Sequence, residues 1–568
     1  MSHKSTNKIA IENSKRGTSD WKLDKPALNR EIEGYASQTS INAGESINLF
    51  VSSISPRYSL TVYRMGWYKG LGARQITDPI TLTGIVQETP VPDAETGMVE
   101  CNWTNSYTLI TSASWTSGVY LAKLEEQKSN TQSYIIFVIR DDENSPSLLF
   151  QLPITTYQAY NYWGGKSLYD TGSGSLEKWG TNTGEHATKV SFNRPFARSN
   201  NTKAAFGVGA GEFLTNVQPV TTHNYPISSA AWDYNMVRWL EKNNYDLGYI
   251  TNIDTHNKPN LLTKTKVFLS QGHDEYWSAE MRNNVTLARD SGVNLTFFSS
   301  NTMYWQVRLE KSTLTQEPNR TMVCYKNADE DPIKGIKSTI NYRDIKEQKS
   351  EATVMGVQYI LDPVQGHIKI SNPDHWVFAN TNLKQGQLLK GLLGYEVDAV
   401  VKDSPNNVII LASSPCQNVG KSDYLAILKY MIKKMVSLPS SILINTLKIS
   451  ETMSANIVWL AIAAVLIAGC AATFNFGFAF VMPFALLFLL AFAVWFVKIT
   501  RSGKVVSHMT LYKADSGAQV FATGSMQWSW GLDDFNVPML RKSRQSKQVE
   551  IITENVLRAF GAKKTAPN

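Results

Sequence analysis

Cysteine is scarce in this sequence of 568 residues, which contains only Cys101, Cys324, Cys416 and Cys470. These cysteines form no Cys-x-x-Cys pair and no spacing typical of zinc ligands, so the sequence indicates neither a disulfide framework nor a zinc finger. The first twenty residues are polar and lack an apolar run of seven, which argues against a cleavable secretory signal. We therefore expect a cytoplasmic body.

A basic recognition helix and an aromatic RNA-binding signature are also missing, so we expect no nucleic-acid partner. The net charge is nevertheless +8, and much of the excess lies beside an apolar tract and in the tail, for example at Lys429, Lys498, Arg541 and Lys563. Attraction to anionic lipid headgroups explains this placement.

Residues 457–497 form an apolar tract of 41 residues without Asp, Glu, Lys or Arg. One helix of that length would span about 60 Å, roughly twice the hydrocarbon core of a bilayer. Two helices at about 455–473 and 477–497 fit better, with basic residues on both flanks that stay in the cytoplasm. The sequence thus predicts an integral protein of the cytoplasmic membrane, with both termini and the soluble domains on the cytoplasmic side. A buried core hairpin is the alternative.

Residues 30–145 alternate between apolar and polar side chains and are broken by Gly, Pro, Asn and Ser turns. This pattern predicts strands at 46–51, 58–63, 119–124 and 133–139. Short strands at such spacing are typical of a β-sandwich.

After residue 146 the pattern changes to strands that alternate with helices, which is typical of a parallel α/β sheet. Strands are predicted at 148–154, 245–250, 267–270, 293–298, 408–411 and 518–522, and helices at 232–242, 278–289 and 549–560.

The predicted hairpin interrupts this α/β domain, because sheet strands precede and follow it. The predicted parts are an N-terminal extension (1–29), a β-sandwich (30–145), the first part of the α/β catalytic domain (146–320), an inserted β-rich region (321–400), the continued α/β domain (401–440), the membrane hairpin (441–505) and the completion of the α/β domain with a C-terminal helix (506–568).

Polar clusters follow three successive predicted strands of the α/β domain. In open α/β sheets, ligands bind at the carboxyl ends of the strands, so we expect the clusters at one rim of the sheet. Their ionisable side chains are suited to base, acid or metal-ligand roles. The alternative is that they cap helices and satisfy loop backbone. The candidate residues are His273, Asp274 and Glu275, then Asp254 and His256, and then Asn301.

A polar and aromatic segment, residues 155–165, follows the first strand of this domain. Tyr157 and Tyr160 are three residues apart and can lie on one face of a helical turn, and Asn161 comes next. Ordinary aromatic packing is the alternative. Cys416 is a weaker candidate, as the nucleophile of a glutaminase-like site, because no nucleophile elbow surrounds it.

Several motifs resemble the large (β) subunit of N,N-dimethylformamidase and its relatives. They are EGYAS at 33–37, YRMGWYKGLGAR at 63–74, TYQAYNYWGG at 156–165, GHDEYW at 272–277, GAQVF at 517–521 and QWSWG at 527–531. The resemblance spans roughly residues 30–420 and 508–560 and leaves out the hairpin.

This resemblance implies an immunoglobulin-like sandwich joined to a glutamine-amidotransferase-like (flavodoxin-like) α/β domain. It also implies an amidohydrolase whose mononuclear iron is held by two tyrosine phenolates and one glutamate. Position by position, Glu275 corresponds to the glutamate ligand and His273 to a catalytic histidine. The first tyrosine is either Tyr157 or Tyr160.

The second tyrosine is expected near residues 192–196, where the family pattern reads Arg-Pro-Tyr. This chain has Phe196 there, which carries no oxygen. Tyr234, Tyr225 or a water molecule is a candidate substitute. Otherwise the chain would bind iron weakly, bind another metal, or lack hydrolysis.

The sequence therefore predicts a membrane-tethered, metal-dependent hydrolase of a small amide or another non-peptide C–N bond, in which metal-bound hydroxide attacks the carbonyl. His273, beside Asp274, would act as general base or acid, while Asp254, His256, Asn161 and Asn301 would orient ligands or substrate. Expected partners are an amide-like small molecule, the lipid bilayer, and a homo-oligomer or small companion subunit.

The alternative is a catalytically inactive binding or scaffold protein of the same fold at the cytoplasmic membrane face. Phe196 favours that alternative.

Overall fold

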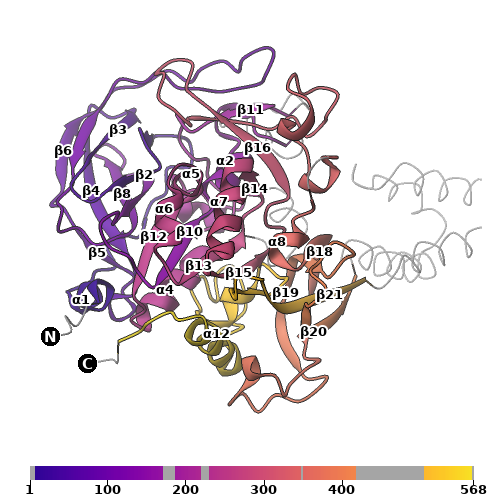
Figure 1. Ribbon diagram of the computed structural model, residues 1–568. Coiled ribbons are helices and arrows are strands. Elements are labelled where there is room, and N and C mark those ends of the chain that lie inside the picture. Colours follow the sequence, from indigo (N-terminus) through magenta and orange to yellow (C-terminus); the bar gives the residue numbers. More distant parts are fainter. Residues whose placement is uncertain (1–6, 170–185, 219–228, 347–348, 418–504, 566–568) are drawn as a thin grey trace, which may run out of the picture. The chain divides into compact units, whose positions relative to one another are not determined.

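The computed structural model describes residues 7–169, 186–218, 229–346, 349–417 and 505–565 (Figure 1). The chain divides into two compact units, one of residues 1–414 and 506–568 and one of residues 415–505. The second unit lies almost wholly outside the described residues. Apart from the ends of two strands, the elements named below belong to the first unit.

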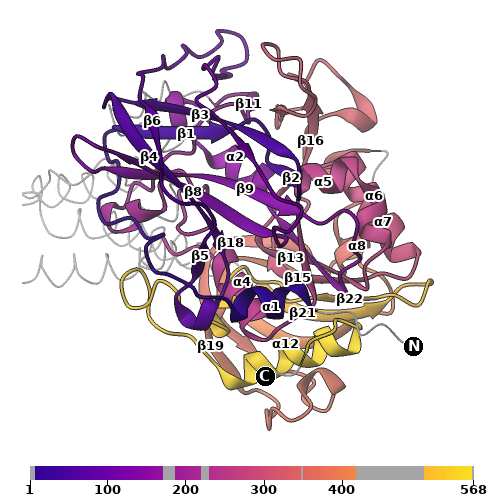
Figure 2. The same ribbon diagram turned by 90° about the vertical axis from the view of Figure 1, so that its left-hand side faces the viewer.

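Two β-sheets near the N-terminus face each other across an apolar core (Figure 2). Leu49 and Val51 of one sheet and Leu60, Val62 and Phe137 of the other are at most 1% exposed. The four predicted strands are confirmed, and the immunoglobulin-like type of the sandwich stays a prediction. One sheet contains β2 (Ser40–Asn42), β9 (Gln132–Arg140), β8 (Gly118–Glu126), β4 (Arg57–Met65), β5 (Ala73–Gln75) and β6 (Ile80–Thr83), and the other contains β1 (Ile32–Ala36), β3 (Ser46–Ser53) and β7 (Tyr107–Ile110).

A seven-stranded sheet forms the centre of the α/β part, as the sequence predicts. Its strands β12, β10, β13, β15 and β22 are mutually parallel, and β21 is antiparallel to β22. When the parallel strands are numbered in chain order, their spatial order across the sheet is 2-1-3-4-5. The chain therefore reverses its winding direction between β10 and β13. In spatial order the strands are β12 (Leu247–Thr251), β10 (Leu148–Leu152), β13 (Val267–His273), β15 (Asn294–Ser300), β22 (Gln519–Ala522), β21 (Val505–Lys513) and β20 (Ile409–Cys416).

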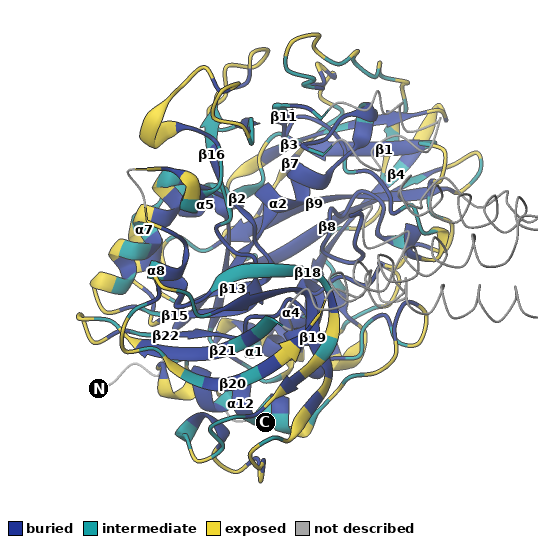
Figure 3. Cartoon of the chain, turned by 90° about the vertical axis from the view of Figure 1, so that its right-hand side faces the viewer, coloured by how far each residue is buried: buried dark blue, intermediate teal, exposed yellow. Residues whose placement is uncertain are grey.

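Helix α7 (Ala279–Asp290) covers one face of this sheet. Met281 and Val285, one turn apart, are fully buried in the same apolar cluster as Phe268 and Leu295. Ser278 caps the helix, because its hydroxyl accepts a 3.1 Å hydrogen bond from the Met281 amide. Figure 3 shows the buried strands of the sheet and the exposed outer side of α7.

Helix α12 (Lys547–Ala559) covers the opposite face. Phe298 stacks on Trp528 with 6.3 Å between ring centroids, and Trp528 donates a 3.0 Å hydrogen bond from Nε1 to Thr553 of α12. Helices predicted at 232–242, 278–289 and 549–560 are therefore all present. The remaining α-helices are α1 (Lys8–Ser14), α2 (Ile154–Tyr160), α4 (Asp233–Lys242), α5 (Asn252–Asn257), α6 (Pro259–Thr263) and α8 (Ala352–Met355).

The predicted β-rich region contains an antiparallel hairpin of β18 (Gln358–Lys369) and β19 (Leu388–Ala399). Asp398 of β19 accepts hydrogen bonds from the Ser300 hydroxyl (2.6 Å) and the Asn301 amide (2.9 Å). These bonds fix β19 to the carboxyl end of β15. A further sheet contains β11 (Lys189–Ser191), β17 (Thr321–Val323), β16 (Trp305–Glu310) and β14 (Tyr276–Ser278).

The predicted membrane localisation is contradicted. Within the described ranges, no helix is long and apolar enough to cross a bilayer. The apolar tract at 457–497, on which the prediction of an integral membrane protein with a bilayer partner rested, lies outside the described residues.

Candidate active site

The site begins at a tight turn where β13 ends. Gly272 has φ +63°, and a Cβ there would lie 3.0 Å from Trp232 Cβ and 3.1 Å from Asp233 Oδ1. Glycine meets both demands, because it adopts positive φ without strain and lets α4 approach closely. The turn places the side chains that follow at the carboxyl edge of the sheet, beside the reversal between β10 and β13.

Asp274 anchors this turn. Its carboxylate accepts hydrogen bonds from Gln151 Nε2 (2.7 Å), Ser270 Oγ (2.9 Å), Trp277 Nε1 (2.9 Å) and Asn252 Nδ2 (3.0 Å). Burial raises the pKa of Asp274, although these four donors oppose the shift. These hydrogen bonds place Asp274 to hold the loop, and the catalytic role predicted for it from the sequence stays a prediction.

Four oxygen-bearing side chains meet next to the turn and form what we call the phenol–carboxylate cluster: Tyr160, Tyr169, Tyr276 and Glu275. Tyr160 Oη donates to Glu275 Oε2 (2.8 Å), and Tyr169 Oη lies 2.7 Å from Tyr160 Oη and 3.1 Å from Glu275 Oε2. Tyr276 Oη donates to Tyr169 Oη (2.6 Å). Helix α2 supplies Tyr160, so it connects the end of β10 to the end of β13.

One carboxylate, that of Glu275, lies among the phenols of the cluster. Burial and the carboxylate of Glu275 raise the pKa of Tyr160 and Tyr169 well above the usual tyrosine value. Burial acts to raise the pKa of Glu275, but His273 and Lys326 outweigh it and lower that pKa. Lys326 Nζ lies 3.4 Å from the centroid of the Tyr169 ring.

His273 faces two carboxylates. Its Nε2 atom lies 3.2 Å from Glu275 Oε2 and 3.2 Å from Glu396 Oε2. Burial opposes a second proton on the ring, but Glu396 and Glu275 raise the pKa of His273 well above the usual value. Burial also raises the pKa of Glu396 to about 7. Because Glu396 belongs to β19, the hairpin contributes directly to the site.

Two predicted tyrosine ligands lie away from the phenol–carboxylate cluster. Tyr157 donates its hydroxyl to Asp233, and its ring meets Phe196 edge-on with 6.4 Å between centroids. Tyr234 donates a 2.6 Å hydrogen bond to the carbonyl of Gly72. Tyr225, the other proposed substitute, lies outside the described residues.

Asn161 ties the loop after α2 to the segment that contains Phe196. Its Nδ2 donates to the Pro195 carbonyl (2.8 Å), and its Oδ1 accepts from the Ala197 amide (3.0 Å). The side chain thus holds backbone and does not face His273 in any described contact.

The other predicted polar residues lie at strand ends but outside the cluster. Asp254 forms an ion pair with Arg140 at 3.1 Å, which links α5 to the sandwich. His256 Nδ1 lies 2.8 Å from Ser278 Oγ, and burial lowers the pKa of His256. Asn301 donates its backbone amide to β19, and its Oδ1 has no hydrogen bond within the described part of the chain.

The sequence reading missed Tyr169, Lys326 and Glu396. Tyr169 lies only four residues after the Trp-Gly-Gly stretch at 163–165. Nothing in the local sequence marks Lys326 or Glu396, because they come from β-rich segments that reach the site only through tertiary packing.

Cys416, the weaker candidate nucleophile, lies on β20, which three strands separate from β13.

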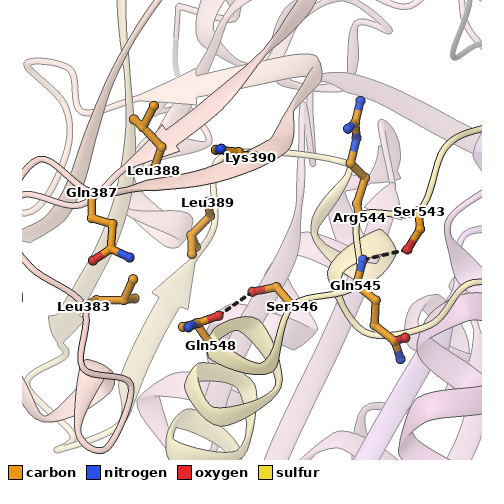
Figure 4. A pocket seen from close by; sticks show the side chains of 10 residues that line it. All are labelled: Leu383, Gln387, Leu388, Leu389, Lys390, Ser543, Arg544, Gln545, Ser546 and Gln548. Atoms are coloured by element: carbon orange, nitrogen blue, oxygen red, sulfur yellow. Dashed lines mark hydrogen bonds between the residues drawn. The ribbon is translucent and has the colours of Figure 1, made fainter.

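Among the described residues, no group of three or more His, Cys, Asp and Glu side chains is arranged to hold a metal ion. A pocket of about 360 Å³ lies elsewhere, between the start of β19 and the residues before α12 (Figure 4). Lys390 and Arg544 line it, but no residue of the phenol–carboxylate cluster does.

Fold and site together define an α/β protein with an enzyme-like polar centre at the carboxyl edge of its sheet. The chain belongs to the N,N-dimethylformamidase beta subunit-like family: the family's C-terminal model matches residues 59–543, which is most of the chain. This match confirms the resemblance carried by the sequence motifs and suggests a dimethylformamidase-like hydrolase. Comparison with curated proteins finds no match.

Proposed function

We propose that this protein is a metal-dependent hydrolase of a small amide or another non-peptide C–N bond. The family supports the reaction class. One observation carries the proposal: the buried phenol of Tyr160, the half-buried phenol of Tyr169 and the Glu275 carboxylate converge within hydrogen-bond distance, with His273 3.2 Å from that carboxylate. Such a set of hard oxygen ligands at the carboxyl edge of a sheet is suited to Lewis-acid hydrolysis.

The proposed metal ligands are Glu275, Tyr160 and Tyr169. Their oxygens lie 2.7 to 3.2 Å from one another, so they already share one small volume. Tyr169 would supply the second phenol that Phe196 lacks. The donor set fits a single ferric ion, which prefers hard oxygen ligands. Burial and the Glu275 carboxylate raise the pKa of both phenols, and a positive ion there would oppose that shift.

When bound, the metal ion would supply Lewis acidity to an amide carbonyl and to the attacking water. The chain's own residues would handle the protons. Glu396, whose pKa burial raises to about 7, is suited to take a proton from water as the oxygen attacks the carbonyl carbon. The same proton then passes to the leaving nitrogen as the C–N bond breaks. His273 stands between Glu275 and Glu396 and would orient both carboxylates.

We further propose that the two N-terminal sheets form an immunoglobulin-like sandwich and that the α/β part is glutamine-amidotransferase-like. The strand order 2-1-3-4-5 supports the second assignment, because flavodoxin-like sheets share it.

Elemental analysis and a visible spectrum of the purified protein test the proposal. We expect about one iron per chain with a phenolate-to-iron absorption band, and release of an amine from small amides. Glu275→Ala should abolish metal binding and hydrolysis. Tyr160→Phe and Tyr169→Phe should each weaken and shift the absorption band.

Tyr157→Phe is the matched control, because Tyr157 lies on the same helix but donates to Asp233 outside the cluster. It should leave the iron content and the spectrum unchanged. Full metal occupancy in Glu275→Ala, or no metal in the unaltered protein, would rule out the proposed site. The second outcome would favour a binding protein of the same fold.

A further inference from the structure

A small cavity lies between the sandwich and the segment of residues 192–196. Its volume is about 20 Å³, which is enough for one water molecule or one monatomic ion of similar size. The four residues of the phenol–carboxylate cluster, all of which the structure describes, do not line it. Apolar side chains form much of the wall, and the exposed Gln38 lies at its rim. Two arginines, Arg194 and Arg320, bring positive charge to this wall.

Arg194 is 1% exposed and has one N–H group without an acceptor. Its two terminal nitrogens donate to three backbone carbonyls, those of Asn161 (2.8 Å), Lys166 (2.9 Å) and Trp163 (3.1 Å). Its Nε atom is buried and has no hydrogen-bond partner among the described residues. A buried donor without an acceptor is destabilising, so an occupant of the cavity that accepts a hydrogen bond would be favoured.

Arg320, which directly precedes β17, is 5% exposed. Its Nη2 atom donates to the carbonyls of Ala36 and Phe192, both at 2.9 Å. Its Nε atom donates to Asn193 Oδ1 (2.9 Å), and Asn193 Nδ2 donates in turn to Glu100 Oε1 (3.0 Å). Glu100 therefore reaches Arg320 only through an amide. Within the described ranges, no hydrogen bond involves Nη1 of Arg320.

The charge of the two guanidinium groups has no direct counter-ion. Among the described residues, neither group forms an ion pair with a carboxylate. Burial lowers the pKa of Arg194 to about 9 and that of Arg320 to about 10, so both stay charged at neutral pH. Cys101 lies near Arg194, but burial raises the pKa of its thiol, which therefore stays neutral. Water would satisfy a donor, whereas an anion would also balance a buried charge.

We propose that this cavity binds one small monovalent anion, with chloride as the common example, against Arg194 and Arg320. The anion accepts a hydrogen bond from Nε of Arg194 and offsets the buried positive charge. The volume favours a monatomic ion over a carboxylate or a phosphate. Because the two arginines hold β1, the segment around Phe192 and the loop after α2, the anion stabilises the contact between the sandwich and the α/β part. This site is independent of the proposed hydrolysis.

Anomalous scattering tests the site directly, in a crystal of the full chain grown with bromide in place of chloride. We expect a bromide peak inside the cavity, beside Nε of Arg194. A water molecule there without anomalous signal would overturn the proposal, even if bromide were found elsewhere on the surface. This measurement needs no variant, so it decides the question even if substitutions at the arginines prevent folding.

Thermal unfolding of the full chain tests binding in solution. Chloride is exchanged at constant ionic strength against gluconate, which is too large for the cavity. We expect the midpoint to rise by about 1 to 2 °C for each tenfold increase in chloride above its dissociation constant. Arg194→Met and Arg320→Met should each remove most of this rise, because each takes away one of the two charges that attract the anion.

Arg282→Met is the matched control. Arg282 is 6% exposed, donates to the carbonyl of Ser350 (2.9 Å) and has a pKa lowered by burial, but it does not line the cavity. This variant should keep the chloride dependence. A rise that persists unchanged in folded Arg194→Met and Arg320→Met would be a general salt effect and would overturn the proposal. A bromide peak without any rise in the unaltered protein would mean binding at crystal concentration only, and would overturn it as well.

Discussion

At the scale of single residues, environment decides what each ionisable group can do. Asp274 and Glu275 are neighbours in the chain, yet four structural donors surround Asp274 whereas Glu275 faces phenols and an imidazole. Glu396 lies across the same imidazole, and burial raises its pKa to about 7. A carboxylate with a pKa near neutrality is suited to exchange protons under physiological conditions.

Glu396→Gln should lower kcat/KM by about 10²- to 10⁴-fold, because it removes the proposed proton acceptor. In the unaltered enzyme, kcat/KM should fall as the pH drops below about 7, where Glu396 becomes protonated. The variant should lose that acidic limb. Steady-state kinetics of amide hydrolysis across the pH range measures both effects.

The same substitution should stabilise the metal-free protein. The folded pKa of Glu396 lies above its ordinary value of 4.5, so its contribution to stability is lost as the pH rises through about 7. The gain of Glu396→Gln in denaturant unfolding should therefore grow with pH. Asp398→Asn, two residues away on β19, is the control and should retain the acidic limb of activity. An acidic limb that persists in Glu396→Gln would exclude Glu396 as the acceptor.

At the scale of elements, helix α1 shows how one buried charge can hold a short helix to its surroundings. Glu12 is fully buried and forms ion pairs with Arg74 (2.5 Å) and Lys15 (2.7 Å). It also accepts hydrogen bonds from the hydroxyls of Tyr68 (2.9 Å) and Thr116 (3.2 Å). Helix α1 has only seven residues, too few for stability on its own, so these contacts hold it in place.

Glu12→Gln should lower the free energy of unfolding by about 1 to 3 kcal/mol at neutral pH. Burial acts to raise the pKa of Glu12, but Arg64, Arg74 and Lys15 outweigh it and lower the pKa from 4.5 to about 2. The stabilising contribution is therefore present above a pH of about 4.5 and lost as the pH falls towards 2.

Denaturant unfolding of both proteins at several pH values measures the difference, which should shrink in acid. Lys15→Ala is the control: Lys15 is 45% exposed, so losing its ion pair should cost well under about 1 kcal/mol. A difference between Glu12→Gln and the unaltered protein that stays constant down to the lowest pH would contradict the assigned role.

At the scale of the whole described unit, buried ion pairs join the sandwich to the α/β part. Arg64 of β4 and Glu241 of α4 are both fully buried and form a two-pronged pair, with Nη2–Oε1 and Nη1–Oε2 distances of 2.8 and 2.9 Å. Tyr249 of β12 donates to the same glutamate at 2.7 Å. Two segments far apart in the sequence thus share one desolvated charge pair.

Arg64→Met and Glu241→Gln should each lower the free energy of unfolding by about 3 to 5 kcal/mol, because each leaves one buried charge unpaired. The double variant should cost clearly less than the sum of the two. Denaturant unfolding of all four proteins gives the interaction energy. The half-exposed pair Lys189–Glu310 is the control and should be close to additive. Additive losses for Arg64 and Glu241 would show that the pair acts as two independent contacts.

Most secondary structure of the first unit followed from the sequence, because strand and helix periodicity are local patterns. Alternating apolar residues marked the sandwich strands, and apolar runs followed by polar residues marked β10, β12, β13 and β15. The predicted rim position of His273 and Glu275 followed from the same rule. Helix α1 was missed because it has only seven residues and its stability comes from distant partners.

By itself, the sequence determined the α/β class, the family and the placement of a histidine and a glutamate at a strand end, because each depends on residues adjacent in the chain. Only the tertiary structure decided which tyrosine hydroxyls reach Glu275 and which carboxylate from β19 faces His273. Packing also decided that Asp274 anchors a loop while Glu396 has a pKa near neutrality. The physical reason is that distance, burial and neighbouring charge are properties of the packed chain, and the residue types alone do not contain them.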